Sequence, residues 1–294
     1  MNTLNSYTPY SLASEVTESL MRDGAVVIEE LFDAGQVIGE LAGYFEATPT
    51  SQGFFYGSST KRFGALMRKS QTIERLCTHP VLVNAATAAL GQHCTSIQLN
   101  LTQAIEILPD EKPQFLHRDD ELFPFEKDFV TMVNVMLALD DFTPENGGTR
   151  YVKGSHKWSR DREPERSDIE HVSMKAGSCL IYLGNLLHAG GGNTTQKSRR
   201  GAILGYNLGW LRQTENFMLS VPWDKARHYS DELKRLMGYQ IHRPNVGWVE
   251  GMDPLDWIEK GRPETSSAID ALTDELNVLA QLAQIEPERF SAYL

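Results

Sequence analysis

The heptapeptide QFLHRDD (114–120) places a histidine and two aspartates side by side directly after an apolar pair. If this stretch ends a β-strand, His117 and Asp119 point to the same face, roughly 6–7 Å apart. An imidazole and a carboxylate on one face can bind the same divalent ion. Arg118 and Asp120 then point to the opposite face. Because His-x-Asp is a common tripeptide that also suits a solvated loop, the interpretation needs a third ligand.

Three later histidines are candidates for that ligand: His156, His171 and His188. His156, in KGSHKW, and His171, after the charged segment RDREPERSD, both have the surroundings of surface residues. His188 follows the apolar segment SCLIYLGNLL and comes just before GGGN. A strand buried on both faces delivers its last residue into the core or a pocket, and glycines allow close backbone approach. We therefore favour His188; a hydrogen-bonded core histidine is the alternative.

Arg199 and Arg200 begin the next apolar segment, RRGAILGYNLGW. A guanidinium binds a carboxylate through two parallel hydrogen bonds, so an arginine near a ferrous ion indicates a dicarboxylate cosubstrate with its other end on the metal. Because side chains alternate along a strand, only one of the pair points inward, and we favour Arg199. The alternative is that both arginines cap the strand in solvent.

The elements that must position these residues are short strands from residue 96 onward. Hydrophobic patterning predicts strands at 96–108, 130–142, 149–154, 171–184 and 200–211, separated by the turn sequences PENGG, KAG and GGGN. It also predicts a strand at 25–31 and helices at 11–22, after Asp33, at 73–90 with a break at Pro80, at 231–237 and at 266–282. Strands do not alternate with helices, so we expect an all-β core with flanking helices, a sandwich or barrel.

Two further segments have open interpretations. Residues 48–70 are rich in glycine, serine and aromatics without a clear period, which predicts a long loop able to act as a lid. Near the C-terminus an apolar stripe on the last helix, with Ser266 or Ser267 as its cap, consists of Ile269, Leu272, Leu276 and Leu279. We favour packing of this stripe against the barrel, and a dimer contact is the alternative.

Composition limits the class of protein. The 294 residues are 41% apolar and carry a formal net charge of −11, which excludes a disordered chain and disfavours nucleic acid or anionic membranes as partners. No apolar run reaches the roughly 18 residues of a membrane span, and the first residues lack the pattern of a signal peptide. The three cysteines form no C-x-x-C pair, which is typical of reduced thiols. We expect a cytoplasmic protein.

Taken together, His117-x-Asp119, ENGGTRYVKGSHKW and His188-AGGGN with Arg199 resemble the phytanoyl-CoA dioxygenase (PhyH) family. The resemblance is strong over about residues 95–212 and closest to the branch that acts in fungal and bacterial secondary metabolism. It implies a double-stranded β-helix, also called a jelly roll or cupin-like barrel. We expect one domain over residues 1–294, in which a helical segment (residues 1–94) precedes the core (residues 95–212) and a helical extension (residues 213–294) follows it.

The resemblance also implies Fe(II), 2-oxoglutarate and O₂ as cofactor and cosubstrates, with succinate and CO₂ released. His117, Asp119 and His188 would bind the iron, and Arg199 would pair with the distal carboxylate of 2-oxoglutarate. Related halogenases lack the carboxylate ligand, so Asp119 predicts oxygenation, desaturation or rearrangement.

Three more residues match positions near the family's cosubstrate. Gln114 and Thr149 resemble residues that border the 2-oxoglutarate pocket. Asn134, a polar residue inside VTMVNVMLAL, either faces the same pocket or is a hydrogen-bonded core asparagine.

Aromatic residues suggest the kind of substrate. Phe55, Tyr56, Phe123 and Trp210 would line a pocket for a bulky apolar natural product such as a terpenoid or alkaloid, or they are ordinary core residues. A basic group around 61–69 keeps an acyl-CoA substrate open. A cupin-like metal enzyme without 2-oxoglutarate and a non-catalytic barrel are the remaining alternatives, and a homodimer is an expectation from the family.

Overall fold

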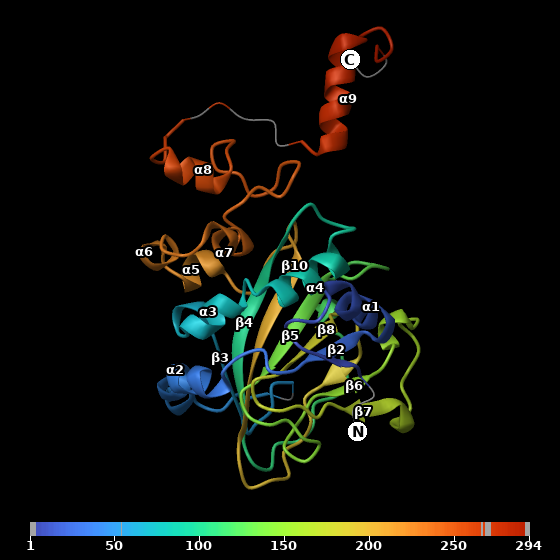
Figure 1. Ribbon diagram of the computed structural model, residues 1–294, viewed down its shortest axis with the longest axis vertical. Helices are drawn as coiled ribbons and strands as arrows, with labels where there is room; N and C mark the ends of the chain where they lie inside the picture. Colours follow the sequence, from blue (N-terminus) through green and yellow to red (C-terminus); the bar gives the residue numbers. More distant parts are fainter. Residues whose placement is uncertain (1–3, 54, 266, 268–271, 292–294) are drawn as a thin grey trace.

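The strands of the computed structural model form two sheets. The larger contains β1 (Ser6–Tyr7), β2 (Ala25–Ile28), β3 (Thr60–Gly64), β4 (Ile97–Ile107), β5 (Met132–Ala138), β8 (Cys179–Leu183) and β10 (Arg199–Leu208). The smaller contains β6 (Arg150–Val152), β7 (Ile169–His171) and β9 (His188–Ala189). Strand order is β1-β2-β8-β5-β10-β4-β3 in the first sheet and β7-β6-β9 in the second (Figure 1). The structure describes residues 4–53, 55–265, 267 and 272–291.

Helices surround this β core. The α-helices are α1 (Ala13–Asp23), α2 (Ala34–Ala47), α3 (Gln71–Leu76), α4 (Pro80–Leu90), α5 (Phe217–Ser220), α6 (Trp223–Ala226), α7 (Asp231–Leu236), α8 (Pro254–Glu259) and α9 (Asp274–Ile285). Short 3₁₀ helices are η1 (Leu66–Arg68), η2 (Asp119–Leu122), η3 (Ser155–Lys157) and η4 (Arg166–Asp168). No helix among the described residues is long and apolar enough to cross a membrane.

Local sequence explains where several helices begin and end. Asp33 caps α2 as predicted, because its carboxylate accepts a hydrogen bond of 3.1 Å from the Gln36 backbone. Pro80 is the first residue of α4, where its missing N–H costs nothing, so the predicted break divides 73–90 into α3 and α4. Gly24 ends α1 with a left-handed φ of 85°.

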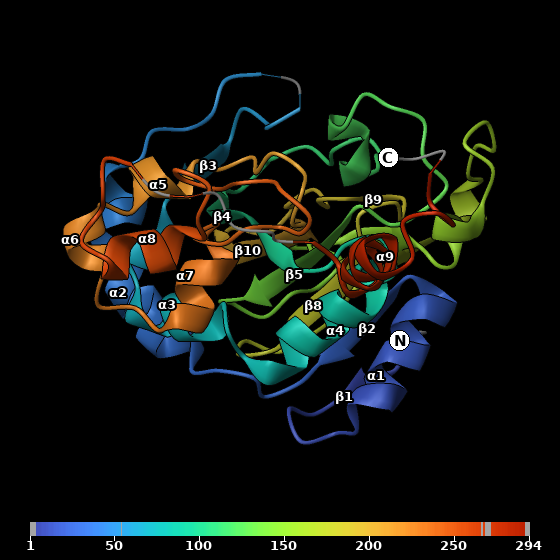
Figure 2. The ribbon, with the colours of Figure 1, turned by 90° about the horizontal axis from the view of Figure 1, so that it is seen from above.

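The two faces of the large sheet contact different parts of the molecule, because successive side chains along a strand point to opposite faces. On β5, Val133, Val135 and Leu137 belong to a hydrophobic core shared with the helices. The alternate residues of the same strand line a cavity: Met132, Asn134 and Met136. In Figure 2, α1, α3 and α4 lie along one face of the sheet. The smaller sheet faces the other side, where a second cluster contains Ile105, Tyr151, Leu186 and Ile203. An all-β core with flanking helices is therefore confirmed.

Three sequence predictions were wrong in detail. The expected strand 171–184 is divided into β7 and β8, because Gly177 turns the chain with a φ of 89°. The expected loop 48–70 contains β3, which pairs with β4, and η1. The expected C-terminal helix begins later, at Asp274, with Thr273 as its cap.

The apolar stripe of the last helix also differs from the expectation. Leu276 and Leu279 are 40% and 48% exposed, and α9 buries no residue, so this helix does not pack against the barrel. Figure 1 shows α9 standing apart from the β core. Ser266 and Ile269 lie outside the described residues.

Candidate metal centre

His117, Asp119 and His188 meet at one point although they are far apart in the chain. One ligand atom of each lies within 4.8 Å of the others. Nε2 of His117 lies 3.4 Å from Oδ1 of Asp119, and Nε2 of His188 lies 3.2 Å from Oδ2. Two imidazole nitrogens and one carboxylate form the ligand set that non-haem Fe(II) enzymes use.

Backbone pairing brings the two histidines together. His117 and His188 form an antiparallel β-bridge in which each N–H donates to the other's carbonyl, both at 3.0 Å. After the bridge the chain turns into η2, which begins at Asp119. The expected alternation holds although only the bridge is β structure: Asp119 points to the histidines, and the side chain of Asp120 is bonded elsewhere.

The hydrogen bonds of the two imidazoles prepare the centre for a cation. Nδ1 of His117 lies 3.1 Å from the Phe115 carbonyl, and Nδ1 of His188 lies 3.0 Å from the Leu186 carbonyl. A carbonyl only accepts, so each Nδ1 carries a proton and each Nε2 faces Asp119. With a metal bound, each Nε2 would supply its lone pair beside the carboxylate. The donor set therefore fits a divalent metal.

The electrostatics of the carboxylate agree with this fit. Burial by itself raises the pKa of Asp119, but the imidazoles of His188 and His117 lower it well below its usual range. Burial likewise lowers the pKa of His188, and Asp119 more than compensates, so that this pKa is raised. Asp119 is thus held in its anionic, metal-binding form.

Asn134 and Tyr182 hold one oxygen of that carboxylate. They lie directly opposite each other on β5 and β8, so both side chains leave the same face of the sheet. Asn134 Nδ2 donates to Asp119 Oδ2 at 2.7 Å, and the Tyr182 hydroxyl lies 3.4 Å from the same atom. Asn134 was expected beside the cosubstrate or as a hydrogen-bonded core residue; it is fully buried and bonded to a candidate ligand. Tyr182 was missed, because its segment shows only an apolar strand.

A cavity of about 410 Å³ opens at the metal centre. Its walls are largely apolar and come from the inner faces of β4, β5 and β10; they include Leu101, Ile105, Met132, Met136 and Ile203. Thr149 and Gln114 also line it. Apolar walls strengthen electrostatic interactions inside the cavity.

Arg199 reaches this cavity and Arg200 does not. Arg199 is 2% exposed, donates to the Gly147 carbonyl and lies over the Phe142 ring at 4.1 Å. Its buried Nε has no hydrogen-bond partner among the described residues. Burial, reinforced by the neighbouring Arg62, lowers its pKa to about 9. A buried guanidinium with spare donors and no carboxylate partner in the described part of the chain is suited to an anionic ligand.

Arg62 is a second cation in the cavity that the sequence did not single out for this place. Its Nη1 donates to Gln103 at 3.0 Å, and its guanidinium lies 5.2 Å from the Tyr56 ring centroid. Burial lowers its pKa. It comes from β3, inside the segment expected to be a loop, and TKRFG shows no alternation that could have predicted the strand.

Gln114 lines the cavity and also makes two hydrogen bonds. Its Oε1 accepts from the Gly190 N–H at 2.9 Å, and its Nε2 donates to the Phe55 carbonyl at 2.6 Å. It therefore connects the 51–59 loop to the segment after His188, while its side chain also borders the cavity.

Of the four aromatic residues expected to line a pocket, two line the cavity. Phe55 and Tyr56 line the cavity at its mouth, where they are 37% and 50% exposed. Phe123 lies instead in a neighbouring open groove with Phe125. Trp210 lies outside the cavity lining, because its Nε1–H donates to the His93 carbonyl at 2.8 Å and its ring is turned toward Phe125. The placement of Phe123 and Trp210 in the pocket was wrong.

The glycines after His188 pack closely against other parts of the chain, and Gly190 also lines the cavity. A Cβ at Gly190 would lie 2.9 Å from Gln114 Oε1, and one at Gly191 would lie 2.6 Å from the Gly148 carbonyl.

The chain is similar to known proteins. The family model for phytanoyl-CoA dioxygenase (PhyH) matches residues 20–201, more than half of the chain. The chain belongs to the PhyH family. Among curated PhyH relatives, the multifunctional dioxygenase prhA of Penicillium brasilianum is 31% identical over 265 residues, 81% of this chain and 86% of prhA. The dioxygenase olcK of Penicillium canescens is 29% identical over 284 residues, 90% of this chain and 92% of olcK.

Solved structures support the PhyH fold. HygX from Streptomyces hygroscopicus, solved with nickel and 2-oxoglutarate, superposes with a TM-score of 0.56 at 20% identity, covering 69% of this chain and 90% of HygX. The epimerase SnoN from nogalamycin biosynthesis gives 0.56 at 24% identity, with 69% and 86% covered. The jelly-roll fold expected from the sequence is thereby confirmed.

Proposed function

We propose that this chain is an Fe(II)- and 2-oxoglutarate-dependent dioxygenase that oxidises a small, largely apolar natural product. The observation that carries the proposal is the convergence of His117, Asp119 and His188 at a cavity that also contains buried Arg199. Membership of the PhyH family and the nickel and 2-oxoglutarate bound to HygX support it. When bound, iron and 2-oxoglutarate supply O₂ activation, with release of succinate and CO₂.

In this proposal His117, Asp119 and His188 hold Fe(II), and Arg199 binds the distal carboxylate of 2-oxoglutarate. Such an anion would offset the burial that lowers the pKa of Arg199. Arg62 adds a second positive charge to the same cavity. Thr149 borders the cosubstrate, and the apolar walls keep water from the reacting atoms.

The substrate half of the cavity would begin at Phe55 and Tyr56, which form its mouth. Aromatic edges and apolar walls suit a terpenoid or alkaloid skeleton. An acyl-CoA is disfavoured, because the basic group around 61–69 does not face solvent as a cluster: Lys61 pairs with Glu106 at 3.3 Å, and Lys69 lies over the Tyr44 and Phe63 rings at 5.0 Å. Asp119 supports oxygenation, desaturation or rearrangement over halogenation.

The proposal also covers the partners, the cellular compartment and the domain organisation of the enzyme. A net charge of −11 supports a small-molecule partner over nucleic acid, and buried free Cys77 and Cys179 suit a reducing cytoplasm. We also propose that residues 1–294 act as one domain, since the larger hydrophobic core joins residues from Val16 on α1 to Leu255 on α8. Exposed Leu276 and Leu279 are compatible with a homodimer.

The experiment measures succinate formed from 2-oxoglutarate by purified protein with Fe(II) and O₂, against a panel of terpenoids, alkaloids and acyl-CoAs. We expect substrate-stimulated succinate formation with a terpenoid or alkaloid, and none in an Asp119→Ala variant. A cupin-like enzyme without 2-oxoglutarate would oxidise substrate in its absence and tolerate Arg199→Ala. A non-catalytic barrel would give no turnover of any candidate and no Fe(II) binding.

A further inference from the structure

Asp120, the second aspartate of HRDD, is not a ligand in the proposed metal site, yet its side chain is fully buried. Asp120 is 0% exposed, and its backbone N–H donates to the Gly184 carbonyl at 3.0 Å. Its carboxylate receives both arms of one guanidinium: Arg160 Nη1 lies 3.0 Å from Oδ1, and Nη2 lies 2.6 Å from Oδ2. This bidentate pair is the strong geometry for a carboxylate and an arginine.

The residue before Asp119 is anchored in the same region. Arg118 is 6% exposed, and its Nε donates to the Asn185 carbonyl at 3.0 Å. Its Nη2 lies 3.5 Å from the Ser155 carbonyl. Asp119 thus lies between two side chains that both extend to the segment 155–160.

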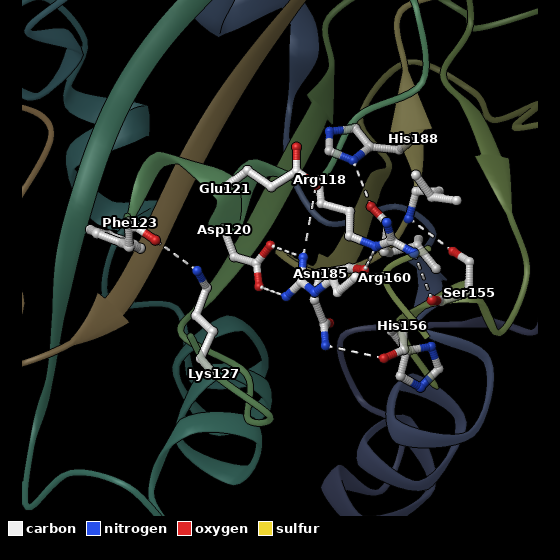
Figure 3. A network of polar contacts seen from close by, with 12 residues as sticks. Arg118, Asp120, Glu121, Phe123, Lys127, Ser155, His156, Arg160, Asn185 and His188 are labelled. Carbon is white, nitrogen blue, oxygen red and sulfur yellow. Dashed lines mark hydrogen bonds and ion pairs between the residues drawn. The ribbon is translucent and has the colours of Figure 1, made fainter. Parts of the chain in front are cut away.

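The segment 155–160 also holds the other ligand-bearing stretch of chain. Ser155 Oγ accepts from the Leu187 N–H at 2.8 Å, directly before His188. Asn185 Nδ2 donates to the His156 carbonyl at 3.2 Å. Figure 3 shows Asp120 joined to Arg160, and Asn185 joined to His156, by dashed lines, with Arg118 and Ser155 nearby.

We propose that the segment 155–160 is a brace that sets the position of Asp119 relative to His188, with Arg160 as a positioning residue that acts through Asp120. The inference deepens the proposed function and rests on it. The arginine side chain is 44% exposed and the aspartate side chain 0%, so the cation approaches from the surface and holds a buried anion in place. Without Arg160, the unpaired Asp120 would be drawn toward water and would move η2, which begins at Asp119.

The brace extends to the substrate cavity. Glu121 and Leu122, the next residues of η2, line the cavity beside the metal centre. Displacement of η2 would therefore change the metal site and the cavity wall together. An ion pair that only stabilises the fold would change neither in protein that remains folded.

The test compares Co(II) binding, followed by its visible absorption, in wild type, Arg160→Ala, Arg160→Lys and a matched control. The control is Arg235→Ala, which breaks an ion pair with Asp253 at 3.3 Å whose side chains are 44% and 16% exposed, against 44% and 0% for Arg160 and Asp120. Arg235 lies on α7, and its side chain bonds to Asp253 at the start of α8. All measurements are made well below each variant's midpoint of thermal unfolding.

We expect Arg160→Ala to weaken Co(II) binding about 10- to 100-fold, the range for loss of a group that orients a metal ligand. Arg160→Lys should recover some of the affinity, Arg235→Ala should leave it unchanged, and the Co(II) spectrum should shift only in the Arg160 variants. Affinity within twofold of wild type in folded Arg160→Ala overturns the brace, and so does an equal loss in Arg235→Ala.

If Arg160→Ala does not fold, the double variant Asp120→Asn with Arg160→Gln replaces it, because it leaves no unpaired buried charge. The same weakening supports the brace, and wild-type affinity overturns it. Failure of wild type itself to bind Co(II) refutes the proposed metal site, and the brace with it, which separates this result from failure of the brace alone.

Discussion

Arg199 and Arg200 are neighbours on β10 whose side chains leave opposite faces of the sheet. Arg199 enters the cavity beside the metal centre. Arg200 forms a bidentate pair with Asp140, with both N–O distances at 2.9 Å. Each residue is therefore the natural control for the other.

Arg199→Ala is expected to raise the KM for 2-oxoglutarate about 10- to 150-fold, since one charged hydrogen-bonded contact contributes about 1.5–3 kcal/mol. Arg200→Ala should leave that KM unchanged and lower the free energy of unfolding by about 0–1 kcal/mol, because its pair is partly exposed. Steady-state succinate assays and urea unfolding measure the two effects. The reverse result, with Arg200→Ala raising the KM, would exchange the two roles.

His188→Ala should abolish tight metal binding, with a loss larger than the roughly 10- to 100-fold expected for residues that only orient a ligand. His171→Ala is the control, since this half-buried histidine on β7 lies outside the cavity lining. The measurement is the metal content of both variants after dialysis against Fe(II) or Mn(II). Retention of a full equivalent by His188→Ala would contradict the ligand assignment.

Asn134→Ala is expected to weaken metal binding about 10- to 100-fold, because Asp119 Oδ2 then loses its 2.7 Å hydrogen bond. Tyr182→Phe should have a smaller effect, since its hydroxyl is 3.4 Å away. Burial, together with Asp119, raises the pKa of Tyr182, so its hydroxyl stays protonated as a donor. Co(II) titration measures the metal affinity of both variants and wild type. Equal affinities in both variants and wild type would show that neither residue positions Asp119.

His156→Gln should make thermal stability less sensitive to acid. Burial lowers the pKa of His156 more than its hydrogen bond to the Met21 carbonyl raises it. Below the unfolded value of about 6.5 the unfolded chain binds more protons than the folded one, so stability falls with falling pH until the folded pKa is reached. The midpoint of unfolding, measured from pH 7 to 5, should fall less steeply in the variant. An unchanged slope would contradict this linkage.

His79, His171 and His242 also have pKa values lowered by burial. The slope in His156→Gln is therefore expected to decrease without vanishing.

Gly191→Ala is expected to lower the free energy of unfolding by about 1–3 kcal/mol, because its Cβ would meet the Gly148 carbonyl at 2.6 Å and rigid backbone must move. Gly39→Ala, on the exposed side of α2 with nothing within 4 Å of the added Cβ, should instead stabilise by about 0.5–1 kcal/mol. Urea unfolding of both variants measures the contrast. An unchanged free energy of unfolding in Gly191→Ala would mean that the backbone at Gly148 can move away from the added Cβ.

The sequence was sufficient to predict the candidate metal centre. His117, Asp119 and His188 have distinctive types and neighbours, and strand alternation predicted which residues of QFLHRDD share a face. The alternation of polar and apolar residues in SIQLNLTQAIEIL likewise predicted the strand β4, because successive side chains of a strand point to opposite faces. Local signals such as Asp33 and Pro80 also marked helix ends correctly.

Contacts between distant segments were decided only by the tertiary structure. Asp120 pairs with Arg160, which lies 40 residues later in a charged loop. In the sequence RDREPERSD, nothing distinguishes Arg160 from a surface residue. The position of Arg62 in the cavity depends on β3 pairing with β4. Trp210 was misplaced because an aromatic residue on a strand gives no sign of which carbonyl its N–H will reach. Side-chain type and period are local properties, whereas the partner of a buried charge is set by chain packing.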